Sequence, residues 1–256
     1  MSVYSIKNKN VISPLFDGWQ ETFIWSCLQD CMGEAYADDL NKPSSAQIIV
    51  GDFCVLAGSA NHEILRNRPE NRQSEFIIMV PQSKHWEEAI ELVFQGKAFR
   101  CTRYATKKDK TAFDKSALQK IVSQLPGEYE LRMIDKALYE QSLALQWSKD
   151  LCGNYPTYED YRLNGMGTAI LKDGELVSGA SSYSFYKGGI EIEIDTREDE
   201  RRKGLALVCG AKLILECLER GLYPSWDAHN KGSLALAERL GYELDREYPA
   251  YEITGF

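Results

Sequence analysis

The sequence has no long apolar run and lacks both common glycine-rich nucleotide-binding motifs. No stretch approaches the roughly twenty apolar residues that span a bilayer. The first residues, MSVYSIKNKN, contain no apolar signal region, so we expect a cytoplasmic protein. The absence of G-x-G-x-x-G and of G-x-x-x-x-G-K-[ST] excludes the usual dinucleotide-binding fold and the P-loop.

Metal and nucleic-acid binding are also disfavoured by the composition. The chain has only 3 histidines, and its 7 cysteines are scattered. Cys27 and Cys31 have no second pair at zinc-ligand spacing, so we expect reduced thiols and no metal. A net charge of −8 argues against a general nucleic-acid surface. We therefore predict no nucleic-acid and no membrane partner, and leave a homodimer open.

The 256 residues suffice for two modest domains or one large one. Short β-branched runs alternate with amphipathic helical periods along the chain, which predicts an α/β (α+β) protein. We place an N-terminal α/β domain at 1–127 and a second domain at 128–256. Long helices are expected from Trp19 to about Ala37 and from Asp135 to Gly153.

The most informative stretch is IEIEIDTREDERRKGLA, residues 190–206. It begins with a period-two strand pattern, passes through a charged turn and reaches Gly204 at the start of an apolar helix. A helix start leaves backbone N–H groups without intrahelical partners and attracts anions. The pattern therefore predicts a diphosphate site. The residues expected around the diphosphate are Arg201, Arg202, Lys203, Gly204, Leu205 and Ala206.

The spacing R-x-x-G-x-A at Arg201–Ala206 resembles the pyrophosphate loop of the GNAT superfamily of acyl-CoA-dependent acyltransferases. The predicted order of elements in the second half is also that of a GNAT domain. The later segment WDAHNKGSLALAERLGY is similar to a family pattern that contains Asn230 and Ser233. This resemblance implies a mixed, mostly antiparallel sheet flanked by helices. It also implies acetyl-CoA as acyl donor and a primary amine of a small molecule or peptide as acceptor.

The resemblance further implies where the donor lies. The pantetheine is expected to pair with the backbone near Ile194 and Thr196, between this strand and the strand at 223–229. Asn230 and Ser233 are expected beside the pantetheine and the thioester sulfur. For these two residues, helix capping is the alternative role.

Acetyl transfer to an amine requires a base, because an alkylamine with a pKa of about 10.4 is almost fully protonated at pH 7. Glu193, and next Glu191, are the candidates; the alternative is a carboxylate ladder paired with cations. In some relatives the base lies on this strand, and counting back from the loop gives Ile190 as the matching position here. In many relatives a tyrosine in the last helix protonates the leaving thiolate, and the matching position here is Ala237. Ser233 is therefore the candidate donor to the sulfur, unless the thiolate leaves unaided.

Two other functions remain open at this point. The chain is alternatively a non-catalytic acyl-CoA-binding regulatory module, or an interaction protein that uses its basic loop. The N-terminal half is interpreted as a degenerate copy of the second half, with PQSKHW (81–86) where the second half has RRKGLA. The alternative is an unrelated α/β substrate or dimerisation domain.

Overall fold

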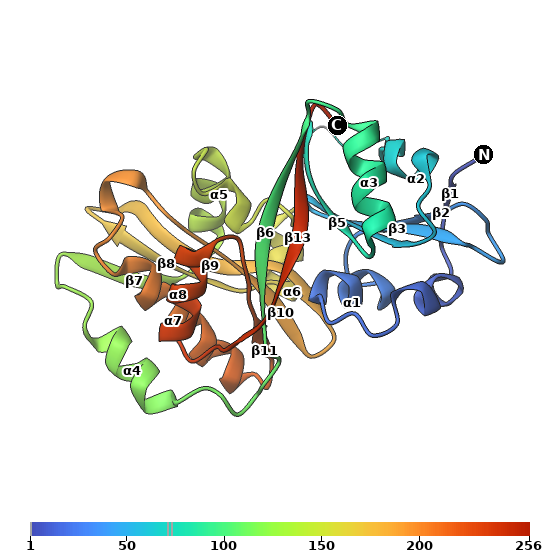
Figure 1. Ribbon diagram of the computed structural model, residues 1–256. Coiled ribbons are helices and arrows are strands. Elements are labelled where there is room, and N and C mark those ends of the chain that lie inside the picture. The colour runs from blue at the N-terminus through green and yellow to red at the C-terminus, as the bar shows by residue number, and fades with distance from the viewer. Residues whose placement is uncertain (1, 71, 73) are drawn as a thin grey trace. The chain divides into compact units, whose positions relative to one another are not determined.

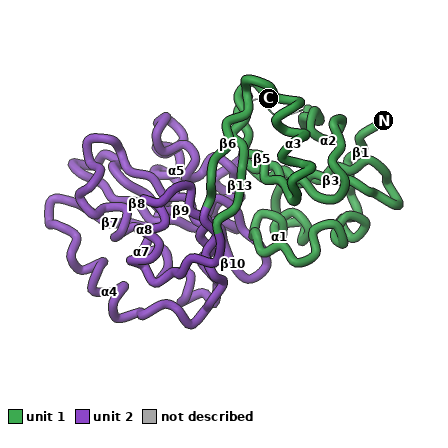
Figure 2. Tube along the Cα trace, viewed as in Figure 1, with its two compact units in different colours: residues 1–103, 247–256 green, residues 104–246 purple. Residues whose placement is uncertain are grey.

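The computed structural model describes residues 2–70, 72 and 74–256, which form two compact units. Unit 1 combines the chain up to Arg103 with Glu247–Phe256, and unit 2 is Tyr104–Arg246 (Figure 2). The predicted division after residue 127 differs from this boundary. Helix α4 (Lys115–Ser123) packs against α7 (Leu205–Glu219) and so lies in unit 2. The last strand, β13 (Leu244–Thr254), pairs with β5 (Phe76–Pro81) and so ends in unit 1.

Among its described residues, unit 1 is built on antiparallel strands that lead to one parallel pair. Helix α3 lies against β5 (Figure 1). Strands β4 and β5 run parallel, from Phe53 opposite Ile78 to Leu56 opposite Pro81. Helices α2 and α3 cover a core that contains Leu56, Met79 and Trp86. Besides β5 and β13, the helices and strands in this part of the chain are β1 (Tyr4–Ser5), η1 (Lys9–Val11), η2 (Ser13–Phe16), α1 (Thr22–Leu28), β2 (Glu34–Ala37), β3 (Ser45–Val50), β4 (Phe53–Gly58), α2 (His62–Arg66), α3 (Lys84–Val93) and β6 (Ala98–Thr106).

Unit 2 contains a sheet in the order β11-β10-β9-β8-β7, again antiparallel except for one parallel pair, β10 and β11. Helix α7 packs on β8, β9 and β10, and its apolar residues build the main core with Ile190 and Trp226. The elements are β7 (Tyr129–Met133), α5 (Lys136–Ala144), η3 (Lys149–Leu151), α6 (Tyr158–Asn164), β8 (Gly167–Lys172), β9 (Glu175–Tyr186), β10 (Gly189–Thr196), η4 (Glu198–Glu200), β11 (Tyr223–Ser225), β12 (Asp227–Ala228) and α8 (Lys231–Arg239).

The predicted fold class, a mixed and mostly antiparallel sheet flanked by helices, is confirmed. Two predicted helices are too long. Helix α1 ends at Leu28, and a turn at Gly33, whose added Cβ would lie 2.4 Å from the Ile49 carbonyl oxygen, leads into β2. Helix α5 ends at Ala144, because Leu145 takes an extended conformation. In the described part of the chain, no helix combines the length and apolarity needed to cross a membrane.

Candidate functional site

The site is organised by a fork between β10 and β11. The two strands pair over three positions, from Gly189 opposite Tyr223 to Glu191 opposite Ser225. After Ser225 the chain continues into β12, which pairs with β6 instead. Strand β10 runs on to Thr196 with β9 on its other side. Among the described residues, no strand therefore pairs with the outer edge of β10 beyond the fork.

The two predicted edge residues differ in their backbone contacts. The Thr196 N–H donates to Asp195 Oδ1 at 2.6 Å, and its carbonyl oxygen accepts from Arg201 Nε at 3.0 Å. Ile194 lies nearer the fork, in the stretch of β10 that β11 has left. An extended amide ligand could add to this edge by main-chain hydrogen bonds. Ile194 is the better placed of the two residues, because the Thr196 backbone already has these partners.

The loop after β10 ends at a helix start without a side-chain cap. Gly204 is the N-cap of α7, has φ 82°, and makes no capping hydrogen bond through a side chain. A Cβ added to Gly204 would meet nothing within 4 Å. The first N–H in this helix with a carbonyl acceptor is that of Val208, which donates to Gly204 at 3.2 Å. Within the described residues, the amides of Leu205, Ala206 and Leu207 thus have no acceptor, which favours an anion.

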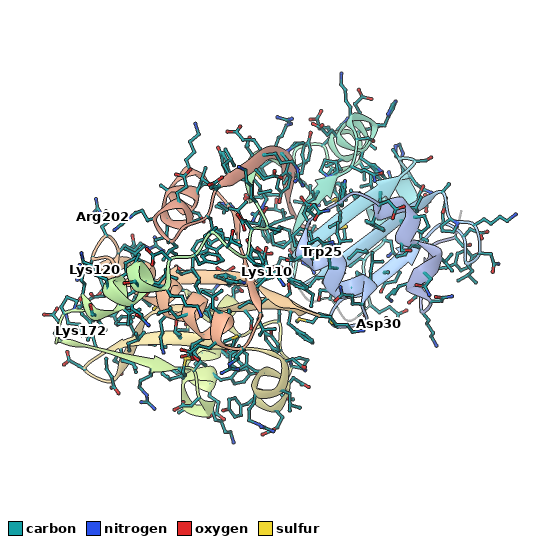
Figure 3. All side chains as sticks on the ribbon, turned by 90° about the horizontal axis from the view of Figure 1, so that it is seen from below. Trp25, Asp30, Lys110, Lys120, Lys172 and Arg202 are labelled. Carbon is teal, nitrogen blue, oxygen red and sulfur yellow. The ribbon has the colours of Figure 1, made fainter. Side chains whose placement is uncertain are left out.

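The three cations predicted for this loop have different surroundings. Arg201 donates to Thr196 and lies 3.8 Å from Asp195, and Lys203 donates to Glu200 at 2.8 Å. Arg202 is exposed, has φ 63°, and extends from the loop without a hydrogen bond or ion pair to any described residue (Figure 3). Arg202 is therefore the cation of this loop that can turn toward a bound anion without breaking an existing contact.

Asn230 caps helix α8 with its side chain, and Ser233 supplies the backbone N–H that it binds. The Asn230 Oδ1 atom accepts from the Ser233 N–H at 2.9 Å, at the start of α8. The Ser233 hydroxyl oxygen accepts from Trp226 Nε1 at 3.1 Å. Because the indole N–H occupies an oxygen lone pair, the hydroxyl proton of Ser233 remains available for donation. The capping role is confirmed for Asn230, whereas the Ser233 hydroxyl bonds Trp226, and the contact of both residues with the donor stays a prediction.

Glu191, Glu193 and Asp195 project from one face of β10. Glu191 lies at the fork opposite Ser184 and Ser225, is 5% exposed, and is less accessible than the half-buried Glu193. Burial, and then the nearby Glu191 carboxylate, raise the pKa values of Tyr186 and Tyr223. Burial also raises the pKa of Asp195, although the Thr196 N–H and Arg201 oppose this shift. Of the two predicted base candidates, Glu193 is therefore the more accessible.

The two positions counted from relatives, Ile190 and Ala237, both lie in the core of unit 2. Ile190 is 1% exposed and packs in the core with α7. The register shift between Glu191 and Ile192 places its extra residue, Tyr183, on β9, so the alternation along β10 is not changed. Ala237 is fully buried in the same core.

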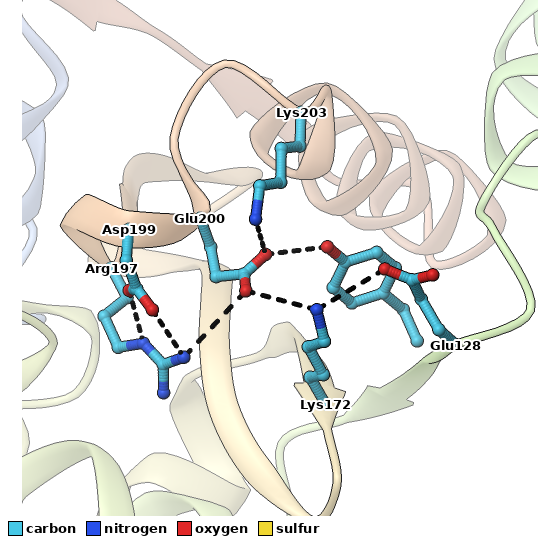
Figure 4. A network of polar contacts seen from close by, with 7 residues as sticks. Glu128, Lys172, Arg197, Asp199, Glu200 and Lys203 are labelled. Atoms are coloured by element: carbon cyan, nitrogen blue, oxygen red, sulfur yellow. Dashed lines mark hydrogen bonds and ion pairs between the residues drawn. The ribbon is translucent and has the colours of Figure 1, made fainter.

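A residue that the sequence analysis missed is Glu200. Its side chain is 5% exposed and accepts hydrogen bonds from Tyr129 and Lys203 (Figure 4). Nothing in the run EDERRK distinguishes Glu200 from the exposed Glu198, because the partners Tyr129 and Lys172 come from distant strands. The described residues include no group of His, Cys, Asp and Glu side chains arranged to hold a metal ion.

A strand fork beside an uncapped, glycine-led helix start is the arrangement that the resemblance to acyl-CoA-dependent transferases predicts. A family model described as GNAT acetyltransferase matches residues 13–251, and the chain belongs to this family. The chain is thus a GNAT-type N-acetyltransferase, and members of this family generally use acetyl-CoA.

Similar proteins support this assignment. A solved GCN5-related N-acetyltransferase-like protein from Streptococcus suis 89/1591 is 49% identical, with a TM-score of 0.91 over 96% of this chain and 98% of its own. An uncharacterized N-acetyltransferase of Bacillus subtilis (strain 168), YdfB, is 27% identical over 96% of this chain and 95% of its own. A tandem GNAT protein from the clavulanic acid biosynthesis pathway shares the fold, with 10% identity and a TM-score of 0.56 over 100% of this chain and 99% of its own.

Proposed function

We propose that this protein moves the acetyl group of acetyl-CoA to a primary amine of a small molecule or peptide in the cytoplasm. The observation that carries the proposal is the first turn of α7, where three backbone amides without acceptors follow an uncapped glycine beside the β10–β11 fork. A diphosphate matches this donor set, because its oxygens accept hydrogen bonds and its charge is favoured at a helix N-terminus.

Each part of the site would hold one part of the donor. The amides of Leu205, Ala206 and Leu207 would bind the diphosphate, with Arg202 as the side chain available to approach it. The outer edge of β10 at Ile194 would hold the pantetheine amides. The thioester, which supplies the activated acetyl group, would then lie near the fork, between β10 and the start of α8.

Glu193 is proposed as the base, directly or through one water, because the acceptor must lose a proton before its nitrogen can attack the thioester carbon. Ser233 is proposed to donate its hydroxyl proton in a hydrogen bond to the sulfur as the carbon–sulfur bond breaks. Trp226 Nε1, 3.1 Å from Ser233 Oγ, orients that hydroxyl. The excess of acidic side chains in the chain, 38 against 30 basic ones, favours cationic acceptors.

Ala237 favours a second candidate, an acyl-CoA-binding regulatory module without turnover, since no acid stands at the position where many relatives place one. The deciding experiment measures thiol release from acetyl-CoA with a panel of primary amines, alongside calorimetry of CoA binding. Amine-dependent thiol release supports the transferase. Binding without release under any amine supports the regulatory module, and no binding removes both.

A further inference from the structure

Glu200 closes the short η4 turn that leads into the diphosphate loop, and its carboxylate contacts four side chains. Its Oε2 atom accepts from Tyr129 at 2.7 Å and from Lys203 at 2.8 Å. Its Oε1 atom lies 3.5 Å from Lys172 Nζ and 4.0 Å from Arg197. Figure 4 shows this carboxylate at the centre of the network. The contacts tie the loop to β7 and to the end of β8, two strands far from it in sequence.

The network compensates the charge of this enclosed carboxylate. Glu128 lies 3.4 Å from Lys172, and Asp199 forms two hydrogen bonds with Arg197. The cations Lys172, Arg197 and Lys203 thus face the anions Glu128, Asp199 and Glu200 in equal number. Hydrogen bonds from Lys203 and then Tyr129 lower the pKa of Glu200 to about 2. The carboxylate is therefore ionised at neutral pH and adds no net negative charge beside the anion site.

The loop needs such an anchor because of its backbone. Arg202 adopts φ 63°, a left-handed conformation that non-glycine residues take only when their surroundings enforce it. Its two neighbours are both held by side-chain contacts, Arg201 to the Thr196 carbonyl and Lys203 to Glu200. Arg202 is thus clamped from both sides, immediately before the Gly204 cap.

We propose that Glu200 is a positioning residue, which holds Lys203 and the loop in the conformation that directs the first-turn amides of α7 at a diphosphate. This inference rests on the proposed function, because it assigns Glu200 to the donor part of that site. Glu200 could also have the opposite effect on affinity, because its bond to the Lys203 ammonium keeps that cation from a bound anion. Whether loss of the Glu200 charge weakens or strengthens donor binding therefore decides between the two effects.

The test compares Glu200→Gln with Glu198→Gln, a matched control on the exposed side of the same turn. Calorimetry measures the Kd of CoA and of adenosine 3′-phosphate 5′-diphosphate, which carries the diphosphate without pantetheine. We expect Glu200→Gln to weaken both ligands by about tenfold, a change of about 1.4 kcal/mol, and Glu198→Gln to change neither by more than about twofold. Equal losses for the two ligands locate the defect at the diphosphate, whereas general loosening of the unit would weaken CoA more.

A second variant keeps the test valid if Glu200→Gln does not fold. Tyr129→Phe removes one hydrogen bond to Glu200 and keeps the ring that packs in the core. We expect about a threefold loss of affinity for both ligands. Unchanged or tighter binding in these variants would overturn the inference while the proposed function stands. Failure of the unmodified protein to bind CoA would instead remove the proposed function.

Discussion

Among the described residues, each unit contains one parallel strand pair, and the two pairs end differently. In unit 2, β10 and β11 pair over three positions and then part. In unit 1, β4 and β5 stay together at this end. Gln82 follows Pro81, the last paired residue of β5, and its N–H donates to the Leu56 carbonyl oxygen of β4 at 3.0 Å. The Gln82 side chain also accepts from the Gly58 N–H at 2.8 Å and donates to Leu15 at 2.7 Å. The pair that opens is the one beside the candidate site.

The helix that follows each first strand shows the same contrast. Helix α7 begins at Gly204, which has no side chain to cap its amides. Helix α2 begins after Asn61, whose Oδ1 atom accepts from the N–H groups of Glu63 and Ile64. A helix start offers amides to a ligand only when the chain does not satisfy them itself. Unit 1 thus keeps a parallel pair with a helix between its strands, but Asn61 already binds amides in the first turn of that helix.

The order of the elements points to a different counterpart from the one chosen from the sequence. Residues 81–86 follow β5 and lead into α3, whereas the segment between β4 and α2 has the place in unit 1 that the diphosphate loop has between β10 and α7. The shared order of antiparallel strands, parallel pair and intervening helix supports the proposal that unit 1 is a degenerate relative of unit 2.

We expect the largest effect from Gly204→Val, which tests whether the helix start of unit 2 is needed for CoA binding. A β-branched residue is strongly disfavoured at φ 82°, so the loop must rearrange, and we expect CoA affinity to fall about a hundredfold or more. Gly221→Val is the control, because Gly221 follows the other end of α7 with φ 70° and equally open space. Calorimetry should show near-normal CoA binding for that control. Comparable losses in both variants would refute a specific role of the Gly204 turn.

We expect Ser233→Ala to lower turnover about tenfold. This variant tests whether residues at the open fork take part in catalysis as well as in donor binding. Turnover in the thiol-release assay should fall by about tenfold, with CoA affinity within about twofold. Trp226→Phe removes the indole donor and keeps the hydroxyl, so it separates orientation of the serine from its chemistry. Full turnover in Ser233→Ala would exclude the serine from the mechanism.

Gln82→Ala tests what the closed strand pair contributes to unit 1. Two side-chain hydrogen bonds are lost, so the free energy of unfolding should fall by about 1 to 3 kcal/mol in urea titrations. CoA affinity should not change, because the first turn of α2, the helix between β4 and β5, is capped by Asn61. Gln124→Ala, at an exposed position, is the control. A second CoA site in Gln82→Ala would show that the closed β4–β5 pair alone keeps unit 1 from binding CoA.

The smallest expected effect is the pH dependence of the Glu200 network, which has no counterpart among the α2 capping contacts. The pKa of Glu200 in the folded protein is about 2, below its ordinary value of 4.5, so the ionised form stabilises the fold. Its contribution is complete above the ordinary pKa and is lost as the pH falls toward the folded value. The difference in unfolding free energy between the unmodified protein and Glu200→Gln should be constant from pH about 7 to about 5 and shrink toward pH about 3. A difference that stays constant would contradict the low pKa.

The local parts of the site could be predicted from the sequence. The loop from Arg201 to Ala206 and the helix behind it depend on a glycine and on apolar periodicity, which adjacent residues display. Glu200 could not be predicted, because its environment depends on Tyr129, 71 residues away, and on Lys172, 28 residues away. The end of helix α1 was missed for a similar reason, since the turn at Gly33 packs against the distant backbone of Ile49.

The central claim is that the uncapped helix start of α7 binds the donor, while the capped start of α2, at the matching place in unit 1, does not. Titration calorimetry with CoA tests it most directly, by the number of molecules bound to each chain of the unmodified protein and of Gly204→Val. The account predicts one CoA per chain in the first case and no measurable binding in the second. Two molecules per chain, or undiminished binding in Gly204→Val, would contradict it.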